Sequence, residues 1–294
     1  EFDWHRPFRR DMRATTAIEG MPDTHRRFAA RVVPLTFLVD HPIATSPRAV
    51  EVLRALIEDG QSTIGAQLHP WVTPPNEEKI CGINSFSGNL SESLERAKLT
   101  QLTDAIVAAF GFRPLVYRAG RYGIGPHSMA ALHALGYRAD SSMRAGYDYR
   151  ALGGPDFRAV GVDAFRTGPG GAVLELPLTT LFLGRARARG ARLYSALGRF
   201  PGGRGLAARL GLLSRVALTP EDMPIAEAEE AVRVAVGEGV RLLNFSFHSP
   251  SVVPGHTPYV RDAADLAAFH GWWERMFDLL ERLGVAPVSL AGIL

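Results

Sequence analysis

The sequence has few of the features that define several common protein classes. It contains one cysteine, Cys81, so no disulfide can form within the chain. No hydrophobic run reaches the roughly 18 residues that a membrane-spanning helix needs, so we expect no transmembrane segment. The first residues, EFDWHRPFRRDM, are charged and aromatic, unlike a secretory signal. We therefore expect a cytoplasmic bacterial protein, unless a signal has been removed upstream of this sequence.

Lysine is also scarce: only two of the 33 basic residues are lysines, and the rest are arginines. The formal net charge is only +3, which is a slight basic excess. No basic motif with interleaved aromatic residues is present, so a nucleic-acid partner is not expected.

The sequence has the length and the hydrophobic content of one large α/β domain. Its 294 residues are 46% hydrophobic, and α/β barrels of about 250 residues commonly form single domains. We therefore expect one domain over residues 1–294. Strand-like and helical patterns alternate, as in parallel strands joined by crossover helices. The expected strands are 32–39, 62–68, 115–119, 137–142, 173–178, 241–247 and 286–290, and the expected helices are 12–30, 46–60, 91–110, 128–135, 219–237 and 262–283.

The stretch STIGAQLHPWVTPP, residues 62–75, combines a short buried strand with a rigid loop. Its prolines prevent the strand from continuing, so the chain must leave the sheet after Leu68. In α/β barrels, an imidazole at the carboxyl end of a strand can bind a metal or transfer protons. His69 is in this position, although a purely structural, hydrogen-bonded histidine would fit the pattern equally well.

One segment, approximately 183–216, interrupts the alternation. It contains eight arginines, seven glycines and no acidic residue. We interpret it as a solvated basic insertion on the surface; the alternative is a contact with an anionic polymer or a membrane surface.

Polar residues follow four of the expected strands. In a parallel barrel the carboxyl ends of the strands form the face that carries the active site. The four residues are therefore expected to converge on one site: His69, Arg118, Asp140 and His248.

Such a set is suited to the hydrolysis of an amide or an ester. A metal bound by His69 and a carboxylate would polarise the carbonyl and lower the pKa of a bound water. His248 would protonate the leaving nitrogen. Arg118 would keep a carboxylate base ionised through a bidentate contact.

Several ordered motifs resemble those of the polysaccharide deacetylases of the NodB-homology type, in particular the WalW-like branch. They cover nearly the whole chain and are FDWHRPF, FLVDHPIA, IGAQLHPWVTPP, YRAGRYGIGP, DSSM, GGPDF and FSFHSPSVVPGHTPYVRD. The resemblance implies a distorted (β/α) barrel of about seven strands. It also implies a divalent metal, usually zinc, and the removal of N-acetyl groups from a glycan or glycan precursor.

The resemblance also assigns roles to individual residues. His69 corresponds to the second histidine of the metal motif, and Arg118 to the arginine that steadies the base. Asp140 corresponds to the acid that tunes the catalytic histidine, and His248 to that histidine. Three further residues lie in matching stretches near the mouth of the barrel and are expected to bind substrate: Trp71, Tyr122 and His256.

The sequence departs from the family pattern at two points. Gln67 occupies the place of the first metal-binding histidine, and an amide oxygen is a weaker zinc ligand than an imidazole. The acidic pair that ends the family's first strand is represented at most by Glu1, as a metal ligand, and by Asp3. We expect about ten residues upstream of Glu1 to form an apolar strand that ends in two acids, because bare sheet edges invite aggregation.

Three functions are consistent with these observations. The first is a metal-dependent deacetylase of an N-acetylated carbohydrate, with His248 as the general acid. The second is a non-catalytic carbohydrate-binding protein with an eroded metal site. The third is an amidohydrolase of a small cyclic amide, which differs from the first only in its substrate.

Overall fold

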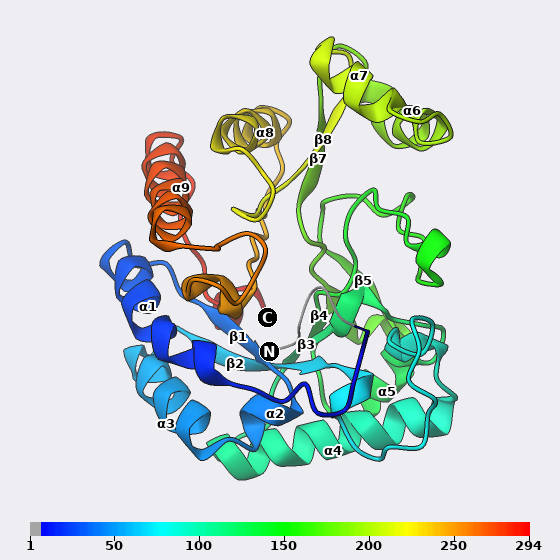
Figure 1. The fold of residues 1–294 in the computed structure, drawn as a ribbon, viewed down its shortest axis with the longest axis vertical. Helices are drawn as coiled ribbons and strands as arrows, with labels where there is room; N and C mark the ends of the chain where they lie inside the picture. Colours follow the sequence, from blue (N-terminus) through cyan, green and yellow to red (C-terminus); the bar gives the residue numbers. More distant parts are fainter. Residues whose placement is uncertain (1–6) are drawn as a thin grey trace.

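A computed structural model describes residues 7–294. Its main sheet has six strands in the order β1-β2-β3-β4-β6-β5 (Figure 1). All neighbours in it are parallel except β5, which is antiparallel to β6. The strands are β1 (Thr36–Val39), β2 (Thr63–Leu68), β3 (Val116–Ala119), β4 (Ala139–Asp140), β5 (Phe165–Thr167) and β6 (Val173–Glu175). The expected α/β class with parallel strands is confirmed.

The helices alternate with the strands as expected, and the structure defines their first and last residues. They are α1 (Met21–Ala30), α2 (His41–Ala44), α3 (Pro47–Leu56), α4 (Glu92–Phe110), α5 (Ser128–Ala134), α6 (Gly190–Leu197), α7 (Gly203–Arg209), α8 (Ile225–Gly237), α9 (Ala263–Arg282) and α10 (Leu290–Ile293). Ser91 caps α4 by accepting a hydrogen bond from the Leu94 backbone, and left-handed Gly111 ends the helix. Within residues 7–294, no helix is long and apolar enough to span a membrane.

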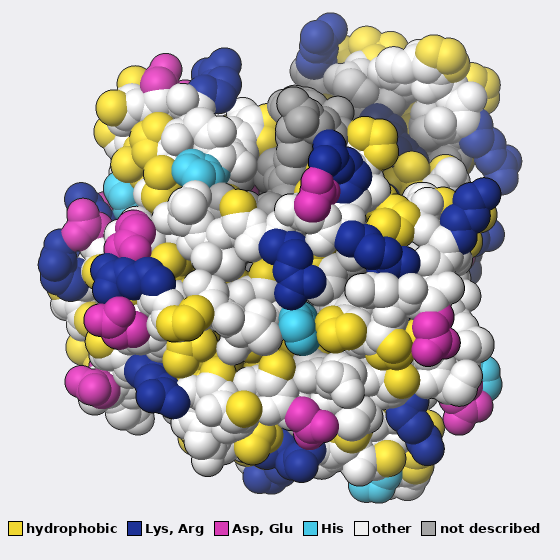
Figure 2. All heavy atoms as spheres, turned by 60° about the horizontal axis from the view of Figure 1, so that its bottom comes forward, with side chains coloured by type: hydrophobic (Ala, Val, Ile, Leu, Met, Phe, Trp, Pro, Cys, Tyr) yellow, Lys and Arg dark blue, Asp and Glu magenta, His cyan; other side chains and the backbone are white. Residues whose placement is uncertain are grey.

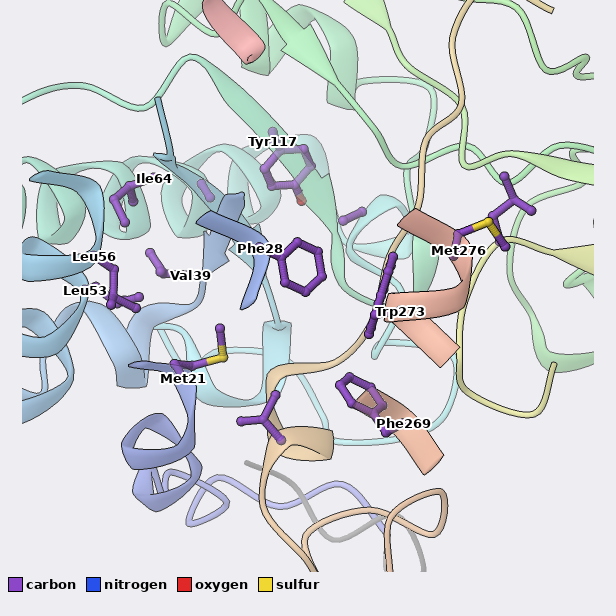
Figure 3. Close-up of a cluster of buried hydrophobic side chains, with 14 of the residues drawn as sticks. Met21, Phe28, Val39, Leu53, Leu56, Ile64, Tyr117, Phe269, Trp273 and Met276 are labelled. Carbon is purple, nitrogen blue, oxygen red and sulfur yellow. The ribbon is translucent and has the colours of Figure 1, made fainter. Parts of the chain in front are cut away.

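The core is formed by α1, α3, α4, α8 and α9 packing around the sheet (Figures 1 and 3). Phe28 of α1 lies edge-on to two aromatic side chains of α9: Trp273, with the ring centroids 4.9 Å apart, and Phe277, at 5.0 Å. Edge-to-face aromatic pairs are favourable beyond their buried area. These contacts join the first helix to the last long one, which fixes both ends of the described chain around the same sheet.

Two expected strands are not formed. In residues 241–247 the Asn244 carbonyl accepts a hydrogen bond from the Thr179 amide, and the Ser246 amide donates to the Leu218 carbonyl. These partners belong to two different segments, so no ladder develops and the segment stays extended outside the sheet. The other expected strand, 286–290, is replaced by α10, where the Ser289 hydroxyl accepts a hydrogen bond from the Gly292 amide.

The barrel is open within the described residues. β1 pairs with β2 on one side, and its other edge faces a cavity that residues 241–248 line from the opposite side. The expected closure by an upstream strand falls outside the sequence.

The arginine-rich segment is built as a hairpin arm. The strands β7 (Thr180–Leu183) and β8 (Ser214–Ala217) pair antiparallel and carry α6 and α7 between them (Figure 1). Figure 2 shows arginine and hydrophobic side chains on this arm, at the upper right. The segment expected to be a basic surface insertion therefore has strands and helices of its own.

Candidate active site

A cavity of about 1580 Å³ lies at the carboxyl ends of β1, β2 and β3 and continues along the free edge of β1. Three of the four residues that the sequence places in one site line it, namely His69, Arg118 and His248. Asp140 is fully buried and is not among the lining residues. The structure therefore brings three of the four residues to one cavity, and the fourth lies outside its lining.

His69 is held by a carboxylate from the neighbouring strand. β1 and β2 are parallel and in register up to the pair Val39 and Ala66, so Asp40 and His69 both emerge at the same edge. The Nδ1 atom of His69 lies 3.0 Å from Oδ2 of Asp40. The other carboxylate oxygen, Oδ1, accepts a hydrogen bond from the Ile43 amide at the start of α2. Burial raises the pKa of Asp40, but the His69 hydrogen bond and charge outweigh it and lower that pKa overall.

The imidazole of His69 is also confined by its packing. Trp71 stacks on it, with the ring centroids 4.8 Å apart and the planes inclined by 25°. A Cβ atom on Gly120 would lie 2.2 Å from Cδ2 of His69, so only glycine leaves room for the ring. Trp71 itself is buried and lines the cavity. Its ring packs between those of His69 and Phe8, whose centroids lie 4.8 and 4.5 Å away.

His248 is held by a second carboxylate, Glu221. The Nδ1 atom of His248 lies 2.6 Å from Oε2 of Glu221, and the His248 amide donates to Oε1 at 2.9 Å. The Ser251 hydroxyl donates to the same Oε1 at 2.6 Å. Burial raises the pKa of Glu221, but the charge and hydrogen bonds of His248 outweigh it and lower that pKa overall. Glu221 therefore fixes both the backbone and the ring of His248.

Asp140 has a different environment from the one that the family resemblance implies. Its Oδ1 accepts a hydrogen bond from the Ser142 hydroxyl at 2.6 Å, and it lies opposite Glu175 in the β4–β6 ladder. Burial and the negative charge of Asp140 raise the pKa of Glu175, so this pair holds a proton. The carboxylate beside Nδ1 of His248 is Glu221, which corrects the role given to Asp140.

Arg118 is half-buried, and it is not bidentate to a carboxylate of the described residues. Its Nε donates to the Ser141 carbonyl and its Nη2 to the Ser141 hydroxyl, both at 2.9 Å. Asn244 also donates to this hydroxyl, at 3.0 Å. Burial lowers the pKa of the Arg118 guanidinium, and the negative charge shared by Asp140 and Glu175 acts on it without a direct bond. Arg118 therefore supports the wall of the cavity, and the carboxylate contact expected from the sequence is not formed.

The remaining predicted site residues are dispersed. Tyr122 lines the cavity and stacks on Tyr149, with the ring centroids 5.6 Å apart. His256 lies in the loop after Ser249–Val252 and is not among the residues that line the cavity. Glu1 falls outside the described residues.

The described residues do not make a zinc site. No three side chains of the His, Cys, Asp and Glu types converge within residues 7–294. Gln67 and His69 both line the cavity, but Asp40 is engaged with Nδ1 of His69 and with the Ile43 amide. A structural or catalytic zinc ion needs three or four donors. If His69 binds a metal, Gln67 is the other donor that the described residues offer beside it in the cavity, and further ligands are needed.

Two residues of the site were not predicted. Asp40 stands directly after the apolar run of the FLVDHPIA motif, and its position at a strand end is the signal that could have identified it. Glu221 lies in TPED, which the sequence suggests as a helix start. In the structure α8 begins four residues later, at Ile225, and Glu221 turns to His248 instead.

Comparisons with known proteins give likenesses of structure alone. No family model matches the sequence, and no curated protein matches it. A structure described as a polysaccharide deacetylase from Mycobacterium smegmatis is 18% identical, with a TM-score of 0.49 over 93% of this chain and 81% of that one. A polysaccharide deacetylase structure from Pseudomonas aeruginosa PAO1 is 16% identical, with a TM-score of 0.49 over 90% of this chain and 67% of that one.

The PuuE allantoinase structure is 18% identical, also with a TM-score of 0.49, over 88% of this chain and 66% of that one. Similarity at these levels of identity concerns the fold, so the function has to be argued from the site. Polysaccharide deacetylases are thus among the solved structures to which this chain is similar, and they are the family that its sequence motifs resemble.

Proposed function

We propose that the protein is a hydrolase that removes N-acetyl groups from a carbohydrate. The observation that supports this most is the pair of imidazoles lining one cavity, each with its Nδ1 held by a carboxylate: His69 by Asp40 and His248 by Glu221. This arrangement fixes the tautomer and the orientation of each ring, as acid and base catalysis requires.

His248 is the proposed proton carrier. With Nδ1–H donated to Glu221, its Nε2 can take a proton from the attacking water and pass it to the amine that leaves. The ionised Glu221 stabilises the imidazolium formed in between, because the two charges lie 2.6 Å apart in a partly buried site. His69, steadied by Asp40 and Trp71, is the proposed second polar contact of the amide.

The sequence resemblance implies a divalent metal. The proposal gives this metal no step, and the test below asks whether activity requires it. Residues 7–294 supply one imidazole and one amide toward it, His69 and Gln67, so no step of the mechanism above depends on it. The same observation favours the second candidate, a carbohydrate-binding protein without turnover.

The test is acetate release from N-acetylglucosamine oligomers by the purified protein, with and without added Zn²⁺, and by His248→Ala. We expect release by the unmodified protein and a loss of roughly a hundredfold to ten-thousandfold in the variant. Binding of the oligomers without acetate release would favour the binding protein. Turnover of a cyclic amide such as allantoin, with none of the oligomers, would favour the amidohydrolase.

A further inference from the structure

Two arginines at the mouth of the cavity have no acidic partner among the described residues. Arg121 and Arg144 both line the cavity, and neither forms an ion pair with a carboxylate of residues 7–294. Asp40, a carboxylate in the cavity wall, is engaged with His69. Within the part of the chain that the structure describes, the positive charge of the mouth is therefore not neutralised by a carboxylate. Placing cations in a half-buried position without a counter-ion is unfavourable unless a ligand supplies the charge.

Arg144 retains hydrogen-bonding capacity. Its guanidinium lies over the ring of Tyr147, 4.0 Å from the centroid, and 5.4 Å from the centroid of Tyr122. Such contacts use the flat face of the guanidinium and leave its in-plane N–H groups for other partners. Within the described residues, one hydrogen bond is made by these groups, from Nη1 to the Tyr149 hydroxyl at 3.5 Å.

Arg121 reaches the cavity through an unfavourable backbone conformation. Arg121 and Tyr122 have φ values of 55° and 62°, two successive left-handed residues that are not glycine. Each such residue costs of order 1–3 kcal/mol and is typical of ligand-binding segments. Nη1 of Arg121 donates to the Gly82 carbonyl and to the Ser85 hydroxyl, and the guanidinium covers the ring of Phe86 at 4.2 Å.

Stacked tyrosines extend from the mouth. Tyr149 stacks on Tyr122 and on Tyr147, with centroid distances of 5.6 and 5.7 Å. Arg215, from β8 of the hairpin arm, covers the ring of Tyr147 at 3.4 Å. The positive charge of the mouth therefore continues into the segment 183–216, which contains no acidic residue and is visible at the upper right of Figure 2.

We propose that the mouth binds an anionic group carried by the substrate. The group is a carboxylate or a phosphate on an N-acetylated sugar. It accepts in-plane hydrogen bonds from Arg144 and Arg121, while Tyr122 and Tyr149, which line the cavity, contact the sugar ring. Planar, multidentate recognition of these anions is the property that distinguishes arginine from lysine. The identity of the ligand as a sugar rests on the proposed function, whereas the preference for an anion rests on the two arginines.

The experiment is calorimetric titration at low ionic strength with three probes. They are N-acetylglucosamine, N-acetylmuramic acid and N-acetylglucosamine 6-phosphate, which differ in having no anion, a carboxylate and a phosphate. We expect at least one charged probe to bind roughly tenfold more tightly than the neutral one, with the difference shrinking as salt screens the charges. The charged probe that is preferred identifies the anion.

Variants assign the preference to the mouth. Arg144→Gln and Arg121→Gln should each bring the affinity ratio of charged to neutral probe close to one, and Arg144→Lys should restore part of it. Arg96→Gln, on the exposed side of α4, is the matched control and should leave the ratio unchanged. Thermal unfolding of each variant shows that the fold is retained.

Equal affinities for the three probes, or a ratio that Arg144→Gln leaves unchanged, would overturn the inference. Acetate release is recorded on the same samples. Tighter binding of a charged probe without acetate release would sustain the anion site and contradict the proposed function. Acetate release from all three probes, together with equal affinities, would sustain the proposed function and contradict the anion site.

Discussion

Glu221 binds His248 twice, once through the backbone amide at 2.9 Å and once through Nδ1 of the ring at 2.6 Å. A carboxylate that fixes both the main chain and the side chain of a histidine leaves the ring little rotational freedom. It also determines which ring nitrogen carries the proton toward the cavity.

The first prediction follows from this contact. Glu221→Gln removes the charge that stabilises the imidazolium and lets the ring adopt the other tautomer. We expect kcat for acetate release to fall at least about a hundredfold, while the affinity for substrate changes little. Steady-state kinetics measures both quantities. Glu227→Gln, on the exposed side of α8, is the control, and an equal loss in both variants would contradict the role of Glu221.

The second prediction concerns the glutamine in the place of a metal-binding histidine. Gln67 and His69 are two residues apart at the end of β2, and both line the cavity. Residues i and i+2 of a strand point to the same side, so Gln67→His places two imidazoles side by side. Imidazole is a better zinc ligand than an amide, and we expect the zinc affinity to rise roughly tenfold or more.

Titration calorimetry with Zn²⁺ measures this affinity, with Gln67→Asn as the control that keeps an amide. If Gln67→His and Gln67→Asn bind zinc equally, the side chain at this position does not point to a common site with His69.

The sequence predicted those parts of the site that follow from strand ends. His69 and Arg118 could be placed because parallel strands bring their carboxyl ends to one edge, whereas His248 lines the same cavity although the strand expected before it does not form. The partner of each histidine could not be placed in this way. Glu221 reaches His248 through a turn that looks like a helix start, and tertiary contacts decided against the helix there. Asp140 also ends a strand, but its partners Ser142 and Glu175 keep it buried inside the sheet.

The same reasoning explains the two strands that do not form. Residues 241–247 have the apolar pattern of a buried strand, but a pattern specifies burial and not a partner. Their amides and carbonyls bond to Thr179 and Leu218, which belong to different segments. Residues 286–290 were too short for periodicity to distinguish a strand from the turn that starts α10.

The third prediction concerns Lys98, a buried side chain that supports the loop after His69. Its ammonium group donates to the carbonyls of Pro70, Thr73 and Pro75 and pairs with Glu78 at 2.9 Å. Lys98→Met leaves those carbonyls without the ammonium donor and leaves the buried carboxylate of Glu78 with Arg10 as its remaining ion-pair partner. We expect the free energy of unfolding to fall by about 3–5 kcal/mol.

Urea unfolding followed by tryptophan fluorescence measures this loss, and Trp71 in the same loop reports on its local structure. Lys79→Met, at an exposed position of the same loop, should change the free energy of unfolding by less than about 0.5 kcal/mol. Equal stability of the two variants would show that Lys98 does not support the loop.

The last prediction is a dependence of stability on pH that originates in Glu95 of α4. This carboxyl is buried and accepts a hydrogen bond from the Ser128 hydroxyl at 2.6 Å. Burial raises the pKa of Glu95 from its ordinary 4.5 to about 7. Between these two values the folded protein binds more protons than the unfolded chain. The contribution of Glu95 to stability is therefore complete below pH 4.5 and decreases as the pH rises to about 7.

Glu95→Gln keeps an oxygen that accepts the Ser128 hydrogen bond and removes the titration. Stability lost through one such group is at most roughly 1.4 kcal/mol per pH unit. We expect urea unfolding at a series of pH values to show a decline from pH 5 to 7 that is clearly smaller in Glu95→Gln than in the unmodified protein. Glu58→Gln, at an exposed position, should retain the full decline. Parallel curves for all three proteins would mean that Glu95 stays ionised in the folded state, with a carboxylate charge tolerated beside Ser128.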